Sequence, residues 1–219
     1  MPSGFHPPVE EYLKAAYELE EEGTAVIRAR LAHRLGHSGP TVTEMVRRLS
    51  SEGYLFTEGR SLRLTPRGRR SAEAVVRKHR LAECLLADVI GLEWVKVHQE
   101  AGRWEHVISE EVAQRLVALL HDPATCPHGN PIPGSGRTLP PMRPLSESQP
   151  DAKVRLGRIT ETVEVDLELL AYLDAHGFRP GVSAAVEDRA PDGTLTLAVN
   201  GGTLAVGPAL AAQLYVVSE

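Results

Sequence analysis

The chain has 219 residues, which permits one large domain or two smaller ones, and its 42% hydrophobic content is enough to build a core. No apolar run approaches the roughly 20 residues that span a bilayer, and the first residues lack the basic and then apolar order of a signal peptide. Two cysteines do not make a disulfide framework, so we expect a cytoplasmic protein with no membrane partner.

The net charge of −5 is unevenly distributed along the chain. Residues 25–80 carry thirteen Lys and Arg against four Asp and Glu, whereas the flanking segments are acidic. A basic block within an acidic protein is typical of a DNA-facing module, although a solvated basic helix face gives the same charge pattern. Charge alone leaves both interpretations open.

Residues 1–65 are expected to form a winged helix-turn-helix domain. Apolar periodicity predicts an amphipathic helix over 9–21 and a second, short helix over 26–35. The segment GHSGP then turns the chain into a third helix, which Gly53 closes and which carries apolar residues at i, i+3, i+4 and i+7. Two β-prone runs around the turn EGRS predict a small hairpin, the wing.

The third helix is expected to present polar side chains to base edges in the major groove of DNA. The expected contacts at its N-terminal end are Ser38, Pro40, Thr41, Thr43 and Glu44. The expected phosphate contacts are Arg28, Arg30, Arg47, Arg48 and Arg60. Glu44 brings a negative charge to this face, so it either tunes sequence preference or points away. Any three-helix domain gives a similar pattern and many winged helices bind protein, but the wing and the basic block favour DNA.

Residues 66–136 are expected to be helical. A long helical pattern over 66–90 is followed by further helical patterns over 94–108 and 110–120. The amino-acid composition changes from His121 onward, where Pro, Gly and Ser become frequent. This composition predicts an extended segment that leads into a linker.

We place the linker at residues 137–151 and a C-terminal domain at residues 152–219. The period-two pattern of this last domain predicts short strands separated by turns, with a single helix over 166–177. A small β-barrel fits these short strands better than a sandwich. The fold class is therefore α+β.

Two pairs of histidine and carboxylate lie on the adjacent helical patterns. His79 and Glu83 are four residues apart, and a second helix face collects His98, Gly102, Glu105 and His106. Imidazole with carboxylate suits divalent first-row metals, and carboxylate-rich sites favour manganese or iron over zinc. The alternative is a buried network of ion pairs, for instance with Arg80 or Arg103. Cys126 and His128 in CPHG have metal-binding side chains, but we interpret them as loop residues.

These residues, in this order, resemble the diphtheria toxin repressor family of metal-dependent transcriptional regulators. The matching stretches are YELEEEG, IRARLA, SGPTV, RSLRLTP, RKHRLAE, VHQEAGRWEH and GNPIPG. The resemblance implies an N-terminal winged helix-turn-helix, an all-helical metal-binding and dimerisation domain, and a C-terminal SH3-like (FeoA-like) small β-barrel. It also implies a homodimer that binds double-stranded operator DNA, takes two ions per subunit, and represses metal-uptake genes when the metal is plentiful.

The resemblance implies one metal site with three ligands from the helices: His79, Glu83 and His98. In longer members of this family, one or two side chains of the barrel complete this site. Asp166 aligns with one such position. Leu169, which cannot bind a metal, aligns with the other, and Glu168 is a nearby substitute.

The second implied site departs from the iron-responsive pattern. Glu105 and His106 match it, but Glu11 stands where iron-responsive members have a methionine, and Gly102 stands where they have a cysteine. Both departures remove soft sulfur, so the substitutions favour Mn(II), with Fe(II) as the alternative. Manganese-responsive members usually have a carboxylate at the position of Gly102. Either a backbone carbonyl or a water fills that gap, or the second site is weak or empty.

We expect the metal to fix the first helix, which carries Glu11, against the dimerisation helices and so to set the recognition helices for two major-groove half-sites. A metallohydrolase is the competing class, but no HExxH or HxH motif is present, so we expect no catalytic residues and no small-molecule substrate beyond metal ions. A constitutive DNA-binding protein with a purely structural metal is a third interpretation.

Overall fold

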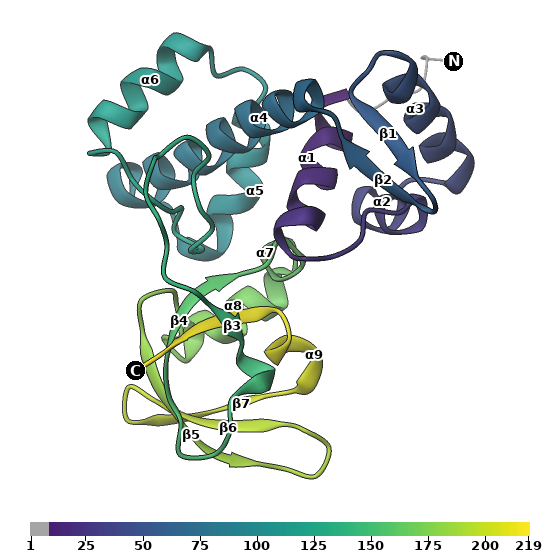
Figure 1. Ribbon diagram of the computed structural model, residues 1–219. Helices are drawn as coiled ribbons and strands as arrows, with labels where there is room; N and C mark the ends of the chain where they lie inside the picture. Colours follow the sequence, from purple (N-terminus) through teal and green to yellow (C-terminus); the bar gives the residue numbers. More distant parts are fainter. Residues whose placement is uncertain (1–8) are drawn as a thin grey trace. The chain divides into compact units, whose positions relative to one another are not determined.

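The computed structural model describes residues 9–219 and divides the chain into two compact units, Met1–Arg77 and Lys78–Glu219. The boundary falls within the helix α4 (Pro66–Cys84). The architecture confirms the predicted α+β class (Figure 1). No helix within residues 9–219 combines the length and apolarity that a membrane span requires.

The first unit is a helix-turn-helix followed by a hairpin (Figure 1). Its elements are α1 (Val9–Glu21), α2 (Arg28–Leu35), α3 (Gly39–Ser51), β1 (Leu55–Glu58), β2 (Ser61–Leu64) and the start of α4. Strands β1 and β2 pair antiparallel, with Leu55 opposite Leu64. The predicted apolar stripe of α3 is buried in a core shared with α1, α2 and the hairpin.

The start of α3 is fixed by its own side chains. The hydroxyl of Ser38 accepts a hydrogen bond from the backbone N–H of Thr41 at 3.3 Å, and Pro40 occupies the first turn, where its missing N–H is not needed. These contacts fix the residue at which α3 begins.

The second unit begins with helices that pack around one apolar cluster. They are the end of α4, the π-helix η1 (Leu85–Ile90), α5 (Trp94–Trp104) and α6 (Glu110–Leu119). The sequence predicted one unbroken helix over 66–90, but the last six residues of that range form the wider π-helical turn. Helix α5 ends at Trp104, four residues before the predicted end, and Glu105 follows as its C-cap residue.

The C-terminal part of this unit is a six-stranded antiparallel sheet of order β3-β8-β4-β5-β6-β7 (Figure 1). The strands are β3 (Arg143–Pro144), β4 (Lys153–Ile159), β5 (Ser183–Arg189), β6 (Leu195–Val199), β7 (Gly202–Val206) and β8 (Leu214–Ser218). Short helices are η2 (Leu145–Glu147), α7 (Glu161–Glu164), α8 (Leu167–Ala175) and α9 (Pro208–Ala211). The strands and helices enclose a core that also buries Trp94 of α5.

The range expected to be a linker contributes to this core. Arg143 and Pro144 pair with β8, and the side chain of Leu145 is fully buried among the barrel residues. Composition alone did not indicate this contribution, because the apolar anchor is a single leucine within a Pro- and Ser-rich run.

Candidate metal centre

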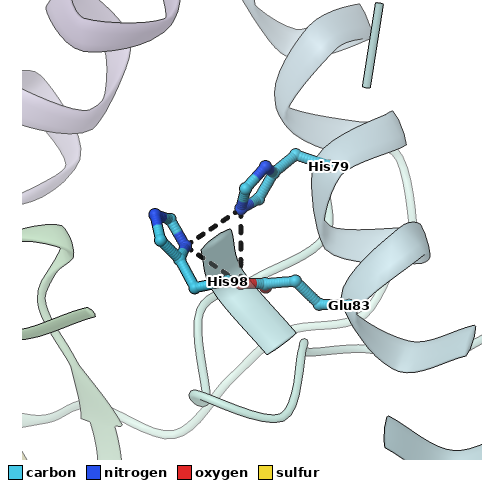
Figure 2. Close-up of side chains that lie close together, drawn as sticks. All are labelled: His79, Glu83 and His98. Carbon is cyan, nitrogen blue, oxygen red and sulfur yellow. Dashed lines mark hydrogen bonds and ion pairs between the residues drawn. The ribbon is translucent and has the colours of Figure 1, made fainter. Parts of the chain in front are cut away.

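Three side chains from two helices meet at one point in the second unit. Nε2 of His79 lies 3.3 Å from Oε1 of Glu83 and 3.1 Å from Nδ1 of His98, and Nδ1 of His98 lies 3.1 Å from Oε1 of Glu83 (Figure 2). Neighbouring ligands of a six-coordinate ion with bonds of about 2.1 Å lie about 3 Å apart, so the spacing of these atoms suits a divalent metal.

The helices place these side chains for a simple reason. His79 and Glu83 are four residues apart on α4, so both project from one face of that helix (Figure 2). His98 comes from the buried side of α5, which packs against the same region.

The loop CPHG brings two further donors to Glu83. Nδ1 of His128 lies 3.2 Å from Oε1 of Glu83, and Glu83, Cys126 and His128 offer donor atoms that all lie within 4.8 Å of one another. All three residues are buried. Within residues 9–219, Oε2 of Glu83 and Nε2 of His128 are buried without a hydrogen-bond partner. A cation bound beside Glu83 would satisfy the free oxygen of this carboxylate, which is costly to bury alone.

Two carboxylates from α7 complete the cluster. Oε1 of Glu161 lies 3.2 Å from Nε2 of His98, and Oε2 of Glu164 lies 3.0 Å from Nδ1 of the same ring. Glu164 also lies 3.4 Å from Nδ1 of His128. The barrel therefore contributes two acidic side chains to a site whose other members come from the helical part.

Backbone contacts hold the loop and the barrel together at this site. The N–H of Ile159 donates to the carbonyl of His128 at 3.0 Å, and the side chain of Asn130 donates to the carbonyl of Ile159 at 2.9 Å and to the carboxylate of Glu164. Gly129 has φ of +86°, and a Cβ at this position would overlap the carbonyl of Gly157, so only glycine allows this close approach.

The electrostatics of the cluster reflect buried opposite charges. Burial acts to lower the pKa of His98, but Glu161, Glu164 and Glu83 raise it well above its ordinary value. Burial acts to raise the pKa of Glu83, but His79 and His128 lower it well below its ordinary value. In the ion-free protein, the protonated ring of His98 therefore offsets part of the buried carboxylate charge.

The two thiols nearby remain protonated. Burial, followed by the charge of Glu83, raises the pKa of Cys84 to about 12 and that of Cys126 well above its ordinary value. Cys84 donates towards the carbonyl of Thr125 at 3.5 Å. Cys126 can act as a thiolate ligand only if a metal displaces its proton.

Residues expected at the second metal site are distributed over both units. Glu11 lies on α1 in the first unit, whereas Gly102, Glu105 and His106 lie at the end of α5 in the second. Oε1 of Glu105 lies 3.4 Å from Nε2 of His106, and a Cβ at Gly102 would meet no heavy atom within 4 Å beyond its neighbours and its own helix backbone. There is room at Gly102 for a side chain or a water.

The structure gives Asp166 and Glu168 a different environment from the one the alignment implied. Oδ1 of Asp166 accepts hydrogen bonds from the backbone N–H groups of Glu168 and Leu169, each at 3.1 Å, and so caps the start of α8. Within residues 9–219, the groups that could hold an ion include Glu161 and Glu164 but neither of these two acidic residues.

Sequence reasoning missed Glu161 and Glu164 and set aside Cys126 and His128. One signal was available for the first pair: ETVE places two carboxylates three residues apart directly after the apolar end of a strand. For CPHG the signal was the motif itself, whose Cys126 and His128 were interpreted as loop residues rather than as ligands, and both are buried beside Glu83.

The residues expected to contact DNA lie on α2, α3 and the wing of the first unit. Exposed side chains among them are Arg28, Arg30, Ser38, Pro40, Thr43, Glu44, Arg47, Arg48 and Arg60. Thr41 is half-buried. Arg30 donates to the carbonyl of Ala25 at 2.7 Å, and Arg48 donates to Glu52 at 2.7 Å.

Three family models match successive parts of the chain. Residues 5–61 match the N-terminal DNA binding domain of iron dependent repressors, residues 65–134 match their metal binding and dimerisation domain, and residues 143–218 match the FeoA domain. Together these matches cover most of the chain in the predicted order.

Similar proteins align with this chain over most of its length. The chain is 45% identical over 205 residues to the iron-dependent repressor IdeR of Mycobacterium tuberculosis, and 46% identical over 203 residues to the diphtheria toxin repressor of Corynebacterium diphtheriae; each alignment covers 88% of both chains. A solved structure described as a manganese-dependent transcriptional repressor in complex with manganese superimposes with a TM-score of 0.88 at 32% identity, covering 96% of this chain and 100% of that one. The chain therefore belongs to the diphtheria toxin repressor family of metal-dependent transcriptional repressors.

Proposed function

We propose that this repressor responds to manganese(II) and controls genes for metal-ion uptake and homeostasis by binding their operators as a homodimer. The observation that carries the metal dependence is the buried cluster around Glu83. It combines carboxylates and imidazoles from the helices, the CPHG loop and the barrel, and it leaves Oε2 of Glu83 and Nε2 of His128 without partners within the described residues.

The first ion would be held at this cluster. We assign His79, Glu83 and His98 as its helical ligands, with Glu164 as the barrel carboxylate that faces the same Nδ1 of His98, while Glu161 faces the other ring nitrogen. Because these four ligands offer nitrogen or oxygen, the donor set suits a hard divalent cation such as Mn(II). When bound, the ion supplies positive charge that replaces the protons on the imidazoles.

The second ion is assigned through the family resemblance to Glu11, Glu105 and His106. Gly102 supplies no side chain there, so a water or a backbone carbonyl would complete the coordination. This set lacks the sulfur donors of the iron-responsive pattern, and the absence of sulfur supports manganese. We expect two ions per subunit, with the second bound more weakly.

An iron(II)-responsive repressor is the competing proposal, and two observations favour it. One relative, 45% identical, is named an iron-dependent repressor, and another, 46% identical, is named a diphtheria toxin repressor. Cys126 also brings one sulfur atom to Glu83 and His128, which softens the donor set on that side of the cluster.

We propose that apolar side chains of the helical part form the homodimer interface. Exposed large apolar residues in the segment matched by the dimerisation model are Val89, Ile90, Val107, Val112 and Leu119. Val107 is 79% exposed. Burial of such side chains between subunits would remove apolar surface from water.

In this proposal the ion acts by shifting an existing equilibrium between arrangements of the recognition helices. Each ion need supply only about 1–3 kcal/mol of coupling to change operator affinity by one or two orders of magnitude. Ion binding would tie α1, through Glu11, to the residues at the end of α5 and so set the separation of the two α3 helices for successive major grooves.

A gel-shift titration tests this function. The full-length protein is freed of metal with chelator and titrated with Mn(II), Fe(II) under anaerobic conditions, or neither, on DNA selected from a random library. Binding that requires Mn(II), occurs at lower Mn(II) than Fe(II), and disappears with chelator supports the proposal. Binding unchanged by chelator indicates a constitutive DNA-binding protein, a preference for Fe(II) supports the iron alternative, and metal-dependent hydrolysis would indicate an enzyme.

A further inference from the structure

We propose that Glu44 reads a C·G base pair in each operator half-site, its carboxylate accepting a hydrogen bond from the N4 amino group of cytosine. The inference rests on the proposed function, because it requires α3 to enter the major groove.

Glu44 occupies the part of α3 that a recognition helix presents to base edges. It is the sixth residue of the helix and lies on the exposed side, opposite the buried Val42, Val46 and Leu49. The N-terminal residues of a recognition helix contact base edges in the major groove, whereas the preceding helix crosses the DNA backbone. A hollow of about 540 Å³ lies over this side of the helix, lined by Thr41, Glu44, Met45, Arg47, Arg48 and Ser51.

The other polar groups near the start of α3 have local partners. The hydroxyls of Ser38 and Thr41 lie 2.7 Å apart, and the hydroxyl of Thr43 donates to the carbonyl of Gly39 at 2.8 Å. Arg48 lies one turn beyond Glu44, but its guanidinium is paired with Glu52 at 2.7 Å. Within residues 9–219, Glu44 has no hydrogen bond or ion pair. Its carboxylate is therefore the acceptor on this surface that no neighbour engages.

An ionised carboxylate accepts hydrogen bonds and cannot donate them, so it discriminates among base pairs. In the major groove, cytosine presents the N4 amino donor, and adenine presents its N6 donor beside the N7 acceptor. Guanine presents two acceptors, and thymine presents one acceptor and a methyl group. Cytosine suits Glu44 best, adenine is weakened by repulsion from N7, and guanine is the least favourable.

The charge of Glu44 also explains why its role is specificity. A carboxylate near the phosphates weakens binding to every sequence, whereas the basic block of residues 25–80 supplies the non-specific attraction. Glu44 therefore contributes by rejecting wrong bases.

The test compares base preferences of the full-length, Mn(II)-loaded protein and its variants. An operator is selected from random DNA, and each base pair of one half-site is then replaced in turn by the other three. For the wild type we expect one position at which C·G binds at least about tenfold more tightly than G·C. In Glu44→Gln the preference at that position moves to A·T, because an amide pairs with N6 and N7 of adenine. In Glu44→Ala the four base pairs bind about equally.

The matched control is Glu58→Gln, which removes one negative charge from the wing. Glu58 is exposed and paired with Arg63 at 3.0 Å. We expect this control to change affinity similarly for all sequences and to leave the preferred bases unchanged. If the wild type binds a defined operator with Mn(II) and Glu44→Gln keeps the same preference at every position, the inference is overturned while the proposed function stands. If the wild type shows no metal-dependent DNA binding, both fall together.

Discussion

Nδ1 of His79 lies 2.5 Å from Oε2 of Glu105, while Nε2 of the same ring lies 3.3 Å from Oε1 of Glu83. In the metal-binding form of His79 we assign the proton to Nδ1, which donates a hydrogen bond to Glu105 and leaves the lone pair of Nε2 directed into the cluster. Metal-binding histidines are oriented in this way by a carboxylate on their second nitrogen. Because Glu105 is also expected to bind the second ion, one carboxylate would connect the two sites.

This relationship predicts that Glu105→Gln weakens both classes of Mn(II) site. The amide still accepts a hydrogen bond from His79, but it carries no charge, so affinity at the first site should fall about 10-fold or more. Titration calorimetry on the metal-free protein measures both classes. The control is Glu100→Gln on the same helix, whose carboxylate pairs with Arg103 at the surface. Loss at only one class of site would contradict the connection.

The sequence predicted the helical part of the cluster because its members are close in local geometry. His79 and Glu83 share one helix face, and the family resemblance added His98. Glu161 and Glu164 escaped prediction because they reach His98 through a long-range packing contact between barrel and helix, which no local pattern encodes. Element types were predictable from periodicity, and the α+β architecture was confirmed.

The misjudged features share a physical cause. The π-helical turn over 85–90 and the burial of Leu145 depend on how neighbouring segments pack, and local propensity is overridden by such packing. His128 is buried because Gly129 lets the loop approach the barrel backbone closely. A single sequence does not show which surface a glycine will face.

Metal-free protein should lose stability as the pH rises above about 6.5. Burial acts to lower the pKa values of His98 and His128, but the surrounding glutamates raise them in the folded state. The stability that these two protonated rings contribute is therefore complete below the unfolded pKa of about 6.5. It is lost as the pH rises through the raised pKa values of the folded state. The lowered pKa of Glu83 makes its contribution present above 4.5 and lost in acid. Urea unfolding with chelator between about pH 6 and pH 9 measures this dependence.

Added Mn(II) should reverse that trend, because metal competes with protons for the same nitrogens and binds better as pH rises. The same unfolding series with Mn(II) provides the comparison. Stability of the chelated protein that increases steadily from pH 6 to pH 9 would show that the imidazoles do not hold protons in the folded state.

Substitutions at Gly102 should change both helix stability and metal preference. Gly102 lies within α5 with open space at its Cβ position, so Gly102→Ala should stabilise the protein by up to about 1 kcal/mol without changing metal affinity. Gly102→Glu adds an oxygen ligand and should tighten the binding of Mn(II) at the second site.

The double variant Glu11→Met with Gly102→Cys should shift the metal preference of the protein towards Fe(II). An unchanged order of metals in anaerobic gel shifts would contradict the donor argument.

The recognition helix should depend on a hydrogen bond from the first helix. The hydroxyl of Tyr12, whose pKa is raised by burial, lies 2.9 Å from Nδ1 of His37, the residue before the N-cap Ser38. Tyr12→Phe should cost about 1 kcal/mol of stability and weaken operator binding severalfold, with little change in Mn(II) affinity. His37→Ala should behave alike, whereas His37→Gln retains an acceptor and should restore much of the affinity. If all three variants bind the operator as tightly as the wild type does, this contact does not position α3.

Asp166 and Glu164 provide a direct comparison between the alignment and the geometry. Asp166→Ala removes the N-cap of α8, so it should destabilise the protein by about 1 kcal/mol and leave Mn(II) affinity unchanged. Glu164→Gln keeps the size of a side chain that accepts a hydrogen bond from Asn130, but it removes a charge beside His98, so it should weaken Mn(II) binding. Thermal unfolding and Mn(II) titration on both variants separate the two roles. If the Asp166 variant loses metal affinity and the Glu164 variant keeps it, the alignment is right and α7 is only a packing element, because a capping carboxylate has no other reason to influence the ion.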